Sequence, residues 1–551
     1  MATIERVLIP TYDKKGNPSF KSITSPPDDS IAVCYMVPDR VIPVIFIPGV
    51  MGSNLQDEKR KPAWLLDSTR TAGTWIKKNA IPRKETLVPE KTSVFRDGKI
   101  PEGTLQNEIE LTRRGWGEIG FISYAEILVW LENTLNDYHD AHNGHRAKLI
   151  GSLLEGGEAL SPITKEEISL SYKYRFPVHA VGYNWLDSNA KSAKRLASKI
   201  DEFILYYTKQ KQRCERVILV THSMGGLVAR YCSEVLGQQS KILGVVHGVM
   251  PAIGAASVYR RMKAGTEVNP GHNLGESAKA WLTSKSLGEN AAEMTAVLSS
   301  APGPLQLLPG VEYGMNWLSI NDWDNPVVTL PKADPYSEIY TVRHKWWGLC
   351  NDQLINPLDK EKKTIDVDWE NFTLIIRESV KSFHEEISQR YHPNSYVFYG
   401  ADSNFKAYGT VKWQRKRWGN PRYQAQLPSQ NDDILNAAST RDDGYGAVSI
   451  KGAAPKELEG NPGHPYPTTG IYQYAQHSVD LEISLPDEIG DGTVPERSGR
   501  APREHVKALV CLQRIGHEPA YKNESRHAQL ITLYGIVKIA QAVQNTSLAY
   551  K

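Results

Sequence analysis

Cysteine is scarce in this chain of 551 residues, and the cysteines that are present lie far apart. Disulfide frameworks and structural zinc sites need evenly paired or closely spaced cysteines. The chain has an odd number of them and no Cys-x-x-Cys pair: Cys34, Cys214, Cys232, Cys350 and Cys511. We therefore expect buried free thiols, with no disulfide scaffold and no zinc site.

The chain also lacks a long apolar run, a signal sequence and an excess of charge. No window of about 18 residues is uninterruptedly apolar, so the sequence predicts no transmembrane helix. Residues 1–20 lack the basic start and apolar run of a signal peptide, so we expect synthesis in the cytoplasm without a cleaved leader. A net charge of +3, from 65 basic and 62 acidic side chains, gives no reason to expect a nucleic-acid partner.

Short apolar runs rich in β-branched residues alternate with a helical pattern in the first half of the chain. Strands are predicted at 41–47, 177–183, 216–221 and 241–251, and an amphipathic helix over about 186–210. A further strand and a closing helix are predicted at 505–512 and 527–543. This alternation predicts an α/β fold with a mostly parallel sheet flanked by helices.

The alternation is interrupted, which suggests insertions into one core. The predicted organisation is an N-terminal leader (1–40), the first part of the core (41–255), a cap or lid insertion (256–394), a core strand (395–402), a second insertion (403–480) and the second part of the core (481–551).

Ser223 lies where a predicted strand turns into a predicted helix, in Thr-His-Ser-Met-Gly-Gly. A sharp strand-to-helix turn exposes a serine hydroxyl to a general base, and the usual pattern is Gly-x-Ser-x-Gly. Gly225 fits that pattern, whereas Thr221 replaces the first glycine. We interpret Ser223 as a nucleophile rather than a helix cap.

An acyl-transfer reaction also needs two N–H donors for the oxyanion that develops. One should be the amide of Met224, directly after the serine. The other should come from the turn Pro-Gly-Val-Met after the strand at 41–47, with Val50 as the first choice and Met51 as the second.

The predicted acid and base lie near the end of the chain. Asp491, between two glycines, is the favoured acid, and Asp402, at the end of the strand Tyr-Val-Phe-Tyr-Gly-Ala-Asp, is the alternative. His517, on the loop after the last strand, is the favoured base, and His527, at the start of the last helix, is the alternative. The order serine, acid, histidine is that of α/β-hydrolases.

Two other patterns in the sequence are less specific. The acidic stretches 321–326 and 441–446 lack EF-hand spacing, so no metal site or other cofactor is expected. The apolar stretch Gly-Pro-Leu-Gln-Leu-Leu-Pro-Gly (303–310) is suited equally to lining an acyl pocket or to packing the cap.

Several motifs together resemble a known family: Val-Ile-Phe-Ile-Pro-Gly-Val-Met-Gly-Ser (44–53), Val-Thr-His-Ser-Met-Gly-Gly (220–226), the stretch 303–310, Gly-Asp-Gly-Thr-Val-Pro (490–495) and Gly-His-Glu-Pro (516–519). The set is similar to the α/β-hydrolase lipases related to lecithin–cholesterol acyltransferase and the PGAP-like esterases. The stretch 250–267 further resembles bacterial lipase effectors of type VI secretion systems.

This resemblance implies a serine esterase acting on ester-linked lipids, specifically a phospholipase A. It also implies export through a needle-type system to the periplasm or membrane of a target cell, an immunity protein and a secretion-apparatus partner. The residues leave two alternatives open: an acyltransferase that uses the same acyl-enzyme, and a non-catalytic module that binds a lipid or a protein.

Overall fold

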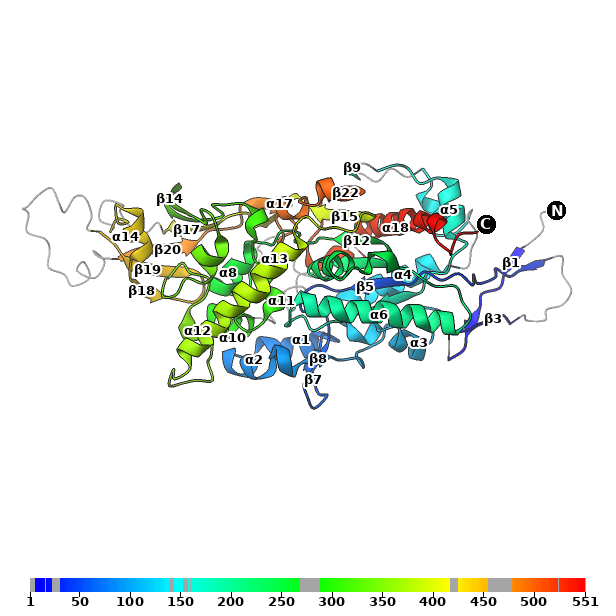
Figure 1. Cartoon of the computed structure of the whole chain (residues 1–551), viewed down its shortest axis with the longest axis horizontal. Coiled ribbons are helices and arrows are strands. Elements are labelled where there is room, and N and C mark those ends of the chain that lie inside the picture. The colour runs from blue at the N-terminus through cyan, green and yellow to red at the C-terminus, as the bar shows by residue number, and fades with distance from the viewer. Residues whose placement is uncertain are drawn as a thin grey trace, which may run out of the picture.

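The computed structural model describes residues 5–14, 16–21, 30–137, 143–151, 157–158, 160–267, 288–416, 425–453, 478–523 and 525–550. Parts of both predicted insertions therefore lie outside the described residues. Figure 1 shows an elongated molecule with both chain termini near one end and the inserted elements toward the other.

A seven-stranded sheet forms the core, in the order β10-β5-β11-β12-β15-β22-β9. Its first six strands are parallel, and only the short edge strand β9 is antiparallel. The strands are β5 (Val44–Ile47), β9 (Gly157–Glu158), β10 (Val178–Ala180), β11 (Val217–His222), β12 (Ile242–Gly248), β15 (Ser395–Gly400) and β22 (Ala508–Leu512). The predicted mostly parallel sheet is confirmed.

Helices cover both faces of this sheet (Figure 1). Side chains of a strand point alternately to opposite faces, so Ile45 packs on one side with Leu196, and Phe46 packs on the other with Tyr124. The first face carries α6 (Asn189–Lys209) and α7 (Gly225–Arg230), and the second carries α4 (Phe121–Leu135) and α18 (Arg526–Ala540). Every residue of β11 and β12 is buried, as expected for strands covered on both sides.

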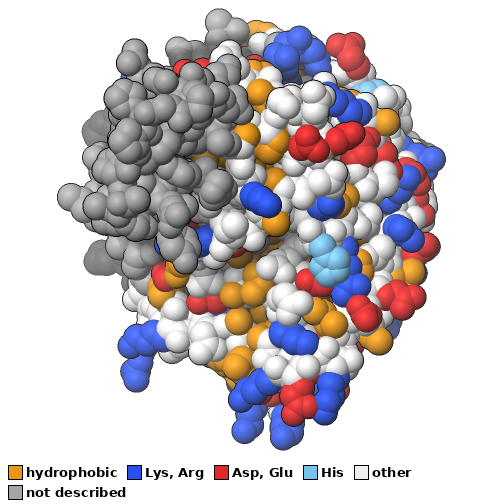
Figure 2. All heavy atoms as spheres, turned by 90° about the vertical axis from the view of Figure 1, so that its left-hand side faces the viewer, with side chains coloured by type: hydrophobic (Ala, Val, Ile, Leu, Met, Phe, Trp, Pro, Cys, Tyr) orange, Lys and Arg blue, Asp and Glu red, His pale blue; other side chains and the backbone are white. Residues whose placement is uncertain are grey.

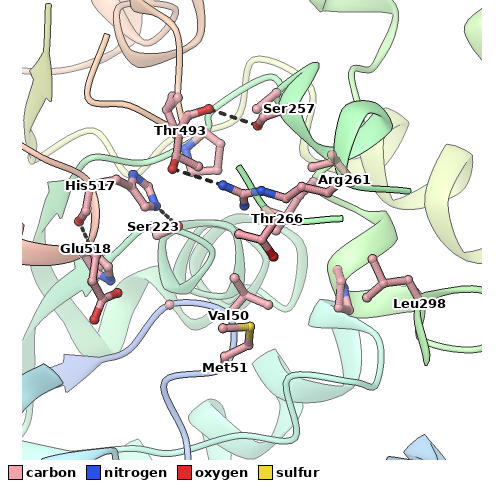
Figure 3. Close-up of a pocket in the computed structure, with 18 of the residues that line it drawn as sticks. Val50, Met51, Ser223, Ser257, Arg261, Thr266, Leu298, Thr493, His517 and Glu518 are labelled. Atoms are coloured by element: carbon pink, nitrogen blue, oxygen red, sulfur yellow. Dashed lines mark hydrogen bonds between the residues drawn. The ribbon is translucent and has the colours of Figure 1, made fainter. Parts of the chain in front are cut away.

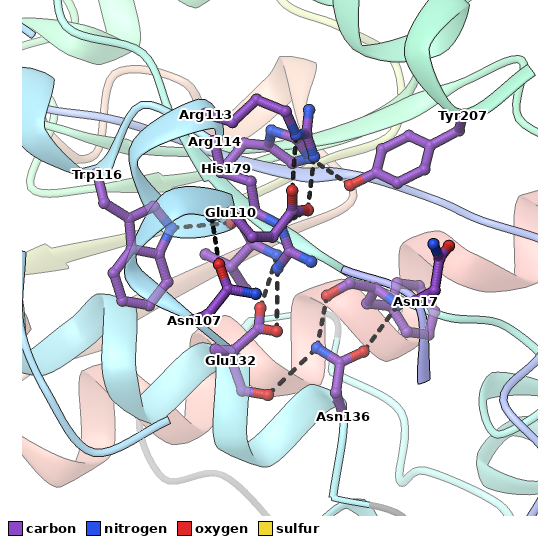
Figure 4. A network of polar contacts seen from close by, with 12 residues as sticks. Asn17, Asn107, Glu110, Arg113, Arg114, Trp116, Glu132, Asn136, His179 and Tyr207 are labelled. Atoms are coloured by element: carbon purple, nitrogen blue, oxygen red, sulfur yellow. Dashed lines mark hydrogen bonds and ion pairs between the residues drawn. The ribbon is translucent and has the colours of Figure 1, made fainter. Parts of the chain in front are cut away.

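A buried ionic network borders the sheet at β10 (Figure 4). Arg114 lies between Glu110 and Glu132, with Nε–Oε1 and Nη1–Oε1 distances of 2.8 and 3.0 Å. Glu132 accepts a hydrogen bond from the amide of Val178, and the amide of Ala180 donates to the Arg114 carbonyl. The network thus satisfies backbone groups of an edge strand that would otherwise be free to pair with another chain.

A second, six-stranded sheet joins the two predicted insertions into one cap. Its order is β14-β13-β17-β20-β19-β18. The strands β13 (Leu318–Asp322) and β14 (Asn325–Leu330) come from the first insertion. The second insertion supplies β17 (Val411–Arg415), β18 (Ser439–Asp442), β19 (Ala447–Lys451) and β20 (Ser478–Ile483). The buried rings of Trp317 and Trp413 pack in the core of this cap.

Cap helices connect this sheet to the core. They are α8 (Ser257–Ala264), α10 (Ala291–Leu298), α11 (Pro302–Leu305), α12 (Ile365–Leu374) and α13 (Ser382–Ile387). Arg230 of α7 ties the start and the end of the first insertion to the core, because its buried guanidinium donates to the carbonyls of Ala252, Ile387 and Arg390. The antiparallel pair β16 (Asp402–Ala407) and β21 (Glu488–Gly490) leads from the core to the second insertion and back.

The described chain also contains short strands and smaller α-helices. They are the pairs β1 (Glu5–Val7) with β4 (Ile31–Val33) and β2 (Thr11–Tyr12) with β3 (Pro18–Ser19), the strands β6 (Leu55–Gln56), β7 (Pro62–Trp64) and β8 (Ser93–Val94), and the helices α1 (Thr69–Ile76), α2 (Ala80–Thr86), α3 (Glu108–Arg113), α5 (Lys165–Ser171), α14 (Asn431–Asn436) and α17 (Glu496–Gly499).

The surface does not concentrate charge of one sign on the face that Figure 2 shows. Basic and acidic side chains are interspersed over the described part of that face, with apolar side chains between them. Among the described residues, no helix combines the length and the apolar character needed to cross a membrane. The described residues also hold no group of three or more His, Cys, Asp or Glu side chains able to bind a metal ion.

Candidate functional site

Ser223 lies on the sharp turn between β11 and α7. Its φ of 51° is in the left-handed region, which is uncommon for a residue other than glycine and is typical of a strained turn at a functional site. The amide of Ser223 donates to the Gly248 carbonyl at the end of β12, at 3.0 Å, which holds the turn. A Cβ on Gly225 would lie 2.5 Å from the Pro48 carbonyl oxygen, so this position requires glycine.

Thr221, which departs from the usual glycine pattern, is accommodated by the neighbouring strand. Its hydroxyl lies 3.0 Å from Nδ1 of His247, its partner in register on β12. The same ring faces Gly226, where a Cβ would come within 3.2 Å of Nδ1. The threonine is therefore hydrogen-bonded and buried instead of crowding the serine.

The structure brings Ser223, His517 and Asp491 together. The Ser223 Oγ lies 2.9 Å from Nε2 of His517, and Nδ1 of His517 lies 2.8 Å from Oδ2 of Asp491. A carboxylate only accepts hydrogen bonds, so Nδ1 carries the proton and the lone pair of Nε2 faces the serine hydroxyl. This is the geometry of a nucleophile with its general base and an orienting acid.

The loop after β21 fixes the Asp491 carboxylate. Its Oδ1 accepts hydrogen bonds from the amides of Thr493 and Val494, at 3.0 and 2.7 Å. The amide of His517 also donates to the Asp491 carbonyl, at 2.8 Å. Asp491 and His517 are therefore held together by a backbone hydrogen bond as well as by the contact between their side chains.

The two alternative residues lie elsewhere. Asp402 begins β16, and its carboxylate accepts hydrogen bonds from the amides of Asn404 and Arg514 instead of contacting His517. His527 is exposed on the first turn of α18, outside the site. The structure thus gives neither residue a place in the triad.

The predicted oxyanion loop lies beside the serine. A Cβ on Gly49 would be 3.1 Å from the Cβ of Ser223, so the turn approaches the serine closely. Val50 and Met51 line the same pocket as Ser223. Within the described chain, the amides of Val50, Met51 and Met224 donate to no backbone or side-chain acceptor.

A buried chain of hydrogen bonds, which was not predicted from the sequence, connects the turn after β5 to His517. Nε2 of His222 faces the carbonyl oxygen of His517 at 2.9 Å and must therefore carry the proton. Nδ1 of His222 then accepts from the Tyr124 hydroxyl at 2.9 Å, and this hydroxyl accepts from the Gly49 amide at 3.0 Å. Burial lowers the pKa of His222 to about 3, which keeps the ring neutral.

The triad opens into a largely apolar pocket under the cap (Figure 3). The pocket contains about 990 Å³ of empty space, including the part open to solvent. Its apolar wall includes Val258, Met294, Leu298, Pro304 and Leu307. The stretch 303–310 therefore both lines the pocket and contributes to packing, because Pro304 and Leu307 line the pocket while Leu305 and Leu308 are buried in the hydrophobic core.

A parallel sheet with a serine on a strand-to-helix turn, followed in the chain by an acid and a histidine after later strands, defines the fold as that of the α/β-hydrolases. The sequence profile of the lecithin:cholesterol acyltransferase family matches residues 152–313. A chain in "The crystal structure of Tle4-Tli4 complex" aligns with 91% of this chain and 98% of its own length, at 29% identity and a TM-score of 0.72. No curated protein matches at a significant level.

These matches confirm the α/β-hydrolase fold with a large inserted cap. They also confirm the predicted resemblance to lipases of the lecithin–cholesterol acyltransferase type and to type VI lipase effectors. The chain is accordingly an ester-hydrolysing or acyl-transferring enzyme.

Proposed function

We propose that the protein is a serine lipase, specifically a phospholipase A, with Ser223 as nucleophile, His517 as general base and Asp491 as the orienting acid. The observation that carries the proposal is the continuous hydrogen-bonded chain from Asp491 through His517 to Ser223, which opens into an apolar pocket. An apolar wall next to a nucleophile suits a fatty acyl chain whose ester carbonyl lies at the serine.

In the acylation half of the reaction, Oγ of Ser223 attacks the ester carbonyl carbon while Nε2 of His517 takes the hydroxyl proton. The carbonyl oxygen becomes an oxyanion, which the amides of Val50 and Met224 stabilise by hydrogen bonds. The intermediate collapses, the C–O bond to the glycerol oxygen breaks, and His517 gives its proton to that oxygen. The products are a lysolipid and an acyl-Ser223 ester.

In the deacylation half, His517 takes a proton from water, which attacks the acyl carbonyl. The second intermediate collapses by breaking the bond to Oγ, and His517 returns the proton to Ser223. The fatty acid leaves, and throughout the cycle Asp491 keeps Nδ1 protonated and stabilises the imidazolium.

We further propose that the enzyme is an effector of a type VI secretion system that is delivered to the periplasm or membrane of a target cell. The resemblance of residues 250–267 to such effectors supports this. The match to a protein solved in a Tle4–Tli4 complex suggests that a partner protein, in the role of an immunity protein, binds this chain too.

Fluorophosphonate labelling of the purified protein, followed by mass spectrometry of the labelled peptide, tests the chemistry. We expect the label on Ser223 and release of fatty acid from phospholipid vesicles. A Ser223→Ala variant should fold normally and lose both. Label on Ser223 without phospholipid turnover would refute the substrate, and an active Ser223→Ala variant would refute the mechanism.

A second candidate function is acyl transfer to an alcohol, and the match to the lecithin:cholesterol acyltransferase family favours it. Both reactions share the acyl-enzyme, and they differ in whether water or an alcohol attacks it. Product analysis with and without a sterol or a simple alcohol separates them: hydrolysis yields only fatty acid, whereas transfer yields a new ester.

A further inference from the structure

One cationic side chain lies in the largely apolar pocket, which also contains the carboxyl group of Glu518. Arg261 of α8 is the only Lys or Arg among the described residues that line the pocket with Ser223 and His517. Figure 3 shows its guanidinium extending from α8 past Thr266 toward Thr493 and the triad. A charged group in an apolar pocket is costly to desolvate unless it is compensated, and an ion pair with Glu267 at 2.9 Å supplies part of this compensation.

The helix that carries Arg261 is held firmly. The Tyr259 hydroxyl donates to the Trp347 carbonyl at 2.6 Å and accepts from Nε1 of Trp413 at 3.0 Å, which fixes α8 on the cap sheet. The Ser257 hydroxyl donates to the Thr493 carbonyl at 3.0 Å, which fixes α8 to the loop that carries Asp491. Arg261 therefore projects into the pocket from a rigid support.

The guanidinium is only partly engaged. Nε donates to Oε2 of Glu267 at 2.9 Å, while Nη2 reaches the Thr493 hydroxyl at 3.3 Å, which is long for a hydrogen bond. No described residue accepts a hydrogen bond from Nη1. The two terminal nitrogens thus present a fork toward the pocket, the arrangement that binds two oxygens of a phosphate group.

We propose that Arg261 binds the phosphate of a glycerophospholipid whose ester carbonyl lies at Ser223, so that Arg261 selects phospholipids over uncharged glycerides. This inference rests on the proposed lipase function and deepens it. Only a short glycerol linker separates the phosphate from the scissile ester, which fits a cation placed in the same pocket as the nucleophile. A phosphate oxygen would replace the long contact of Nη2 with Thr493.

The competing explanation is structural: Arg261 would hold the loop that carries Asp491 through Thr493. Loss of Arg261 would then lower the activity on any ester substrate. Thr493→Val separates the two roles, because it removes the hydroxyl that accepts from Arg261 and leaves the guanidinium in place. Arg526→Gln is the matched charge control, since Arg526 is exposed on α18.

The experiment measures kcat and KM of the wild type, Arg261→Gln, Arg261→Lys, Thr493→Val and Arg526→Gln. The substrates are a phospholipid and a diacylglycerol with the same acyl chains, in the same neutral detergent micelles. We expect Arg261→Gln to lower kcat/KM about 10- to 100-fold on the phospholipid and less than about 2-fold on the diacylglycerol. Arg261→Lys, which keeps the charge but not the fork, should lie in between. Thr493→Val should leave the ratio of kcat/KM on the two substrates unchanged, and Arg526→Gln should match the wild type.

An equal loss on both substrates, reproduced by Thr493→Val, would overturn the phosphate site and leave the lipase function standing. Failure of the wild type to hydrolyse either lipid would instead refute the proposed function, and the phosphate site with it.

Discussion

Replacing Asp491 by asparagine gives a sharp test of the site, because the structure fixes which way the new amide must turn. Oδ1 of Asp491 accepts from two backbone amides, so the asparagine oxygen has to take that position. Its NH₂ group then faces Nδ1 of His517. Two donors cannot face each other, so His517 adopts the tautomer with its proton on Nε2. In that form it donates to Ser223 and no longer accepts the serine proton.

The expected result for Asp491→Asn is a fall in kcat of about 10⁴-fold at pH 7, which corresponds to about 5.5 kcal/mol of transition-state stabilisation. The assay is initial-rate hydrolysis of a water-soluble ester, with circular dichroism as the check of folding. Asp57→Asn is the matched control, because Oδ1 of Asp57 also accepts from two backbone amides, those of Lys59 and Lys61, and the residue has no contact with His517. Its kcat should stay within about 3-fold of the wild type, within the range of substitutions away from the reacting groups. A folded Asp491→Asn enzyme with more than about a tenth of wild-type activity would refute the reasoning.

Three further predictions follow from buried groups. Burial lowers the pKa of both His222 and His247 from 6.5 to about 3, so the unfolded chain binds protons that the folded chain does not. The stability that these two neutral histidines contribute is complete above pH 6.5 and is lost as the pH falls toward 3. At pH 5 the free energy of unfolding should be lower by about 2 kcal/mol per histidine. Urea unfolding followed by tryptophan fluorescence would measure it. Arg230→Met removes three hydrogen bonds and leaves the carbonyls of Ala252 and Arg390 without a donor, so we expect a loss of about 2–4 kcal/mol in the same assay. Gly225→Ala should lower the activity at least about 100-fold, because the new Cβ displaces the turn after β5 at the Pro48 carbonyl. Gly73→Ala, with open space around the new Cβ, should leave the activity unchanged.

Each of these has a contrary outcome. An unfolding free energy that is the same at pH 5 and pH 7 would mean that the two histidines are not kept neutral by the fold. A fully stable Arg230→Met variant would show that the carbonyls of Ala252 and Arg390 are hydrogen-bonded to water instead. An active Gly225→Ala enzyme would mean that the turn after β5 does not have to lie so close to α7.

The local part of the site could be predicted from the sequence. A strand of apolar residues, a serine and two glycines specify the turn at Ser223, because sharp strand-to-helix turns tolerate few other residues. The glycines around Asp491 and the loop position of His517 were also local signals. The structure brings these three residues together, although they are up to 294 residues apart.

The remaining features depend on contacts between distant segments. Tyr124 reaches His222 across 98 residues of sequence, and no local pattern distinguishes it from any other tyrosine on an amphipathic helix. The cap sheet is formed when Leu318 of one insertion pairs with Val411 of the other, so it could not be predicted from either insertion alone. Arg261 belongs to a stretch that resembles secreted effectors, but its direction into the pocket depends on how the cap sheet anchors α8.

The order of strands in the central sheet also governs when the enzyme can become active during synthesis. The turn that carries Ser223 follows β11, and the Gly248 carbonyl that binds its amide lies at the end of β12. β22, which leads to His517, lies between β15 and β9 in the sheet and is the last of its strands to be translated. A nascent chain that lacks β22 and the loop after it contains Ser223 without its general base. The proposed lipase is therefore inactive until the segment with His517 has been synthesised and has joined the sheet, and a producing cell's own membranes meet no active enzyme before that point.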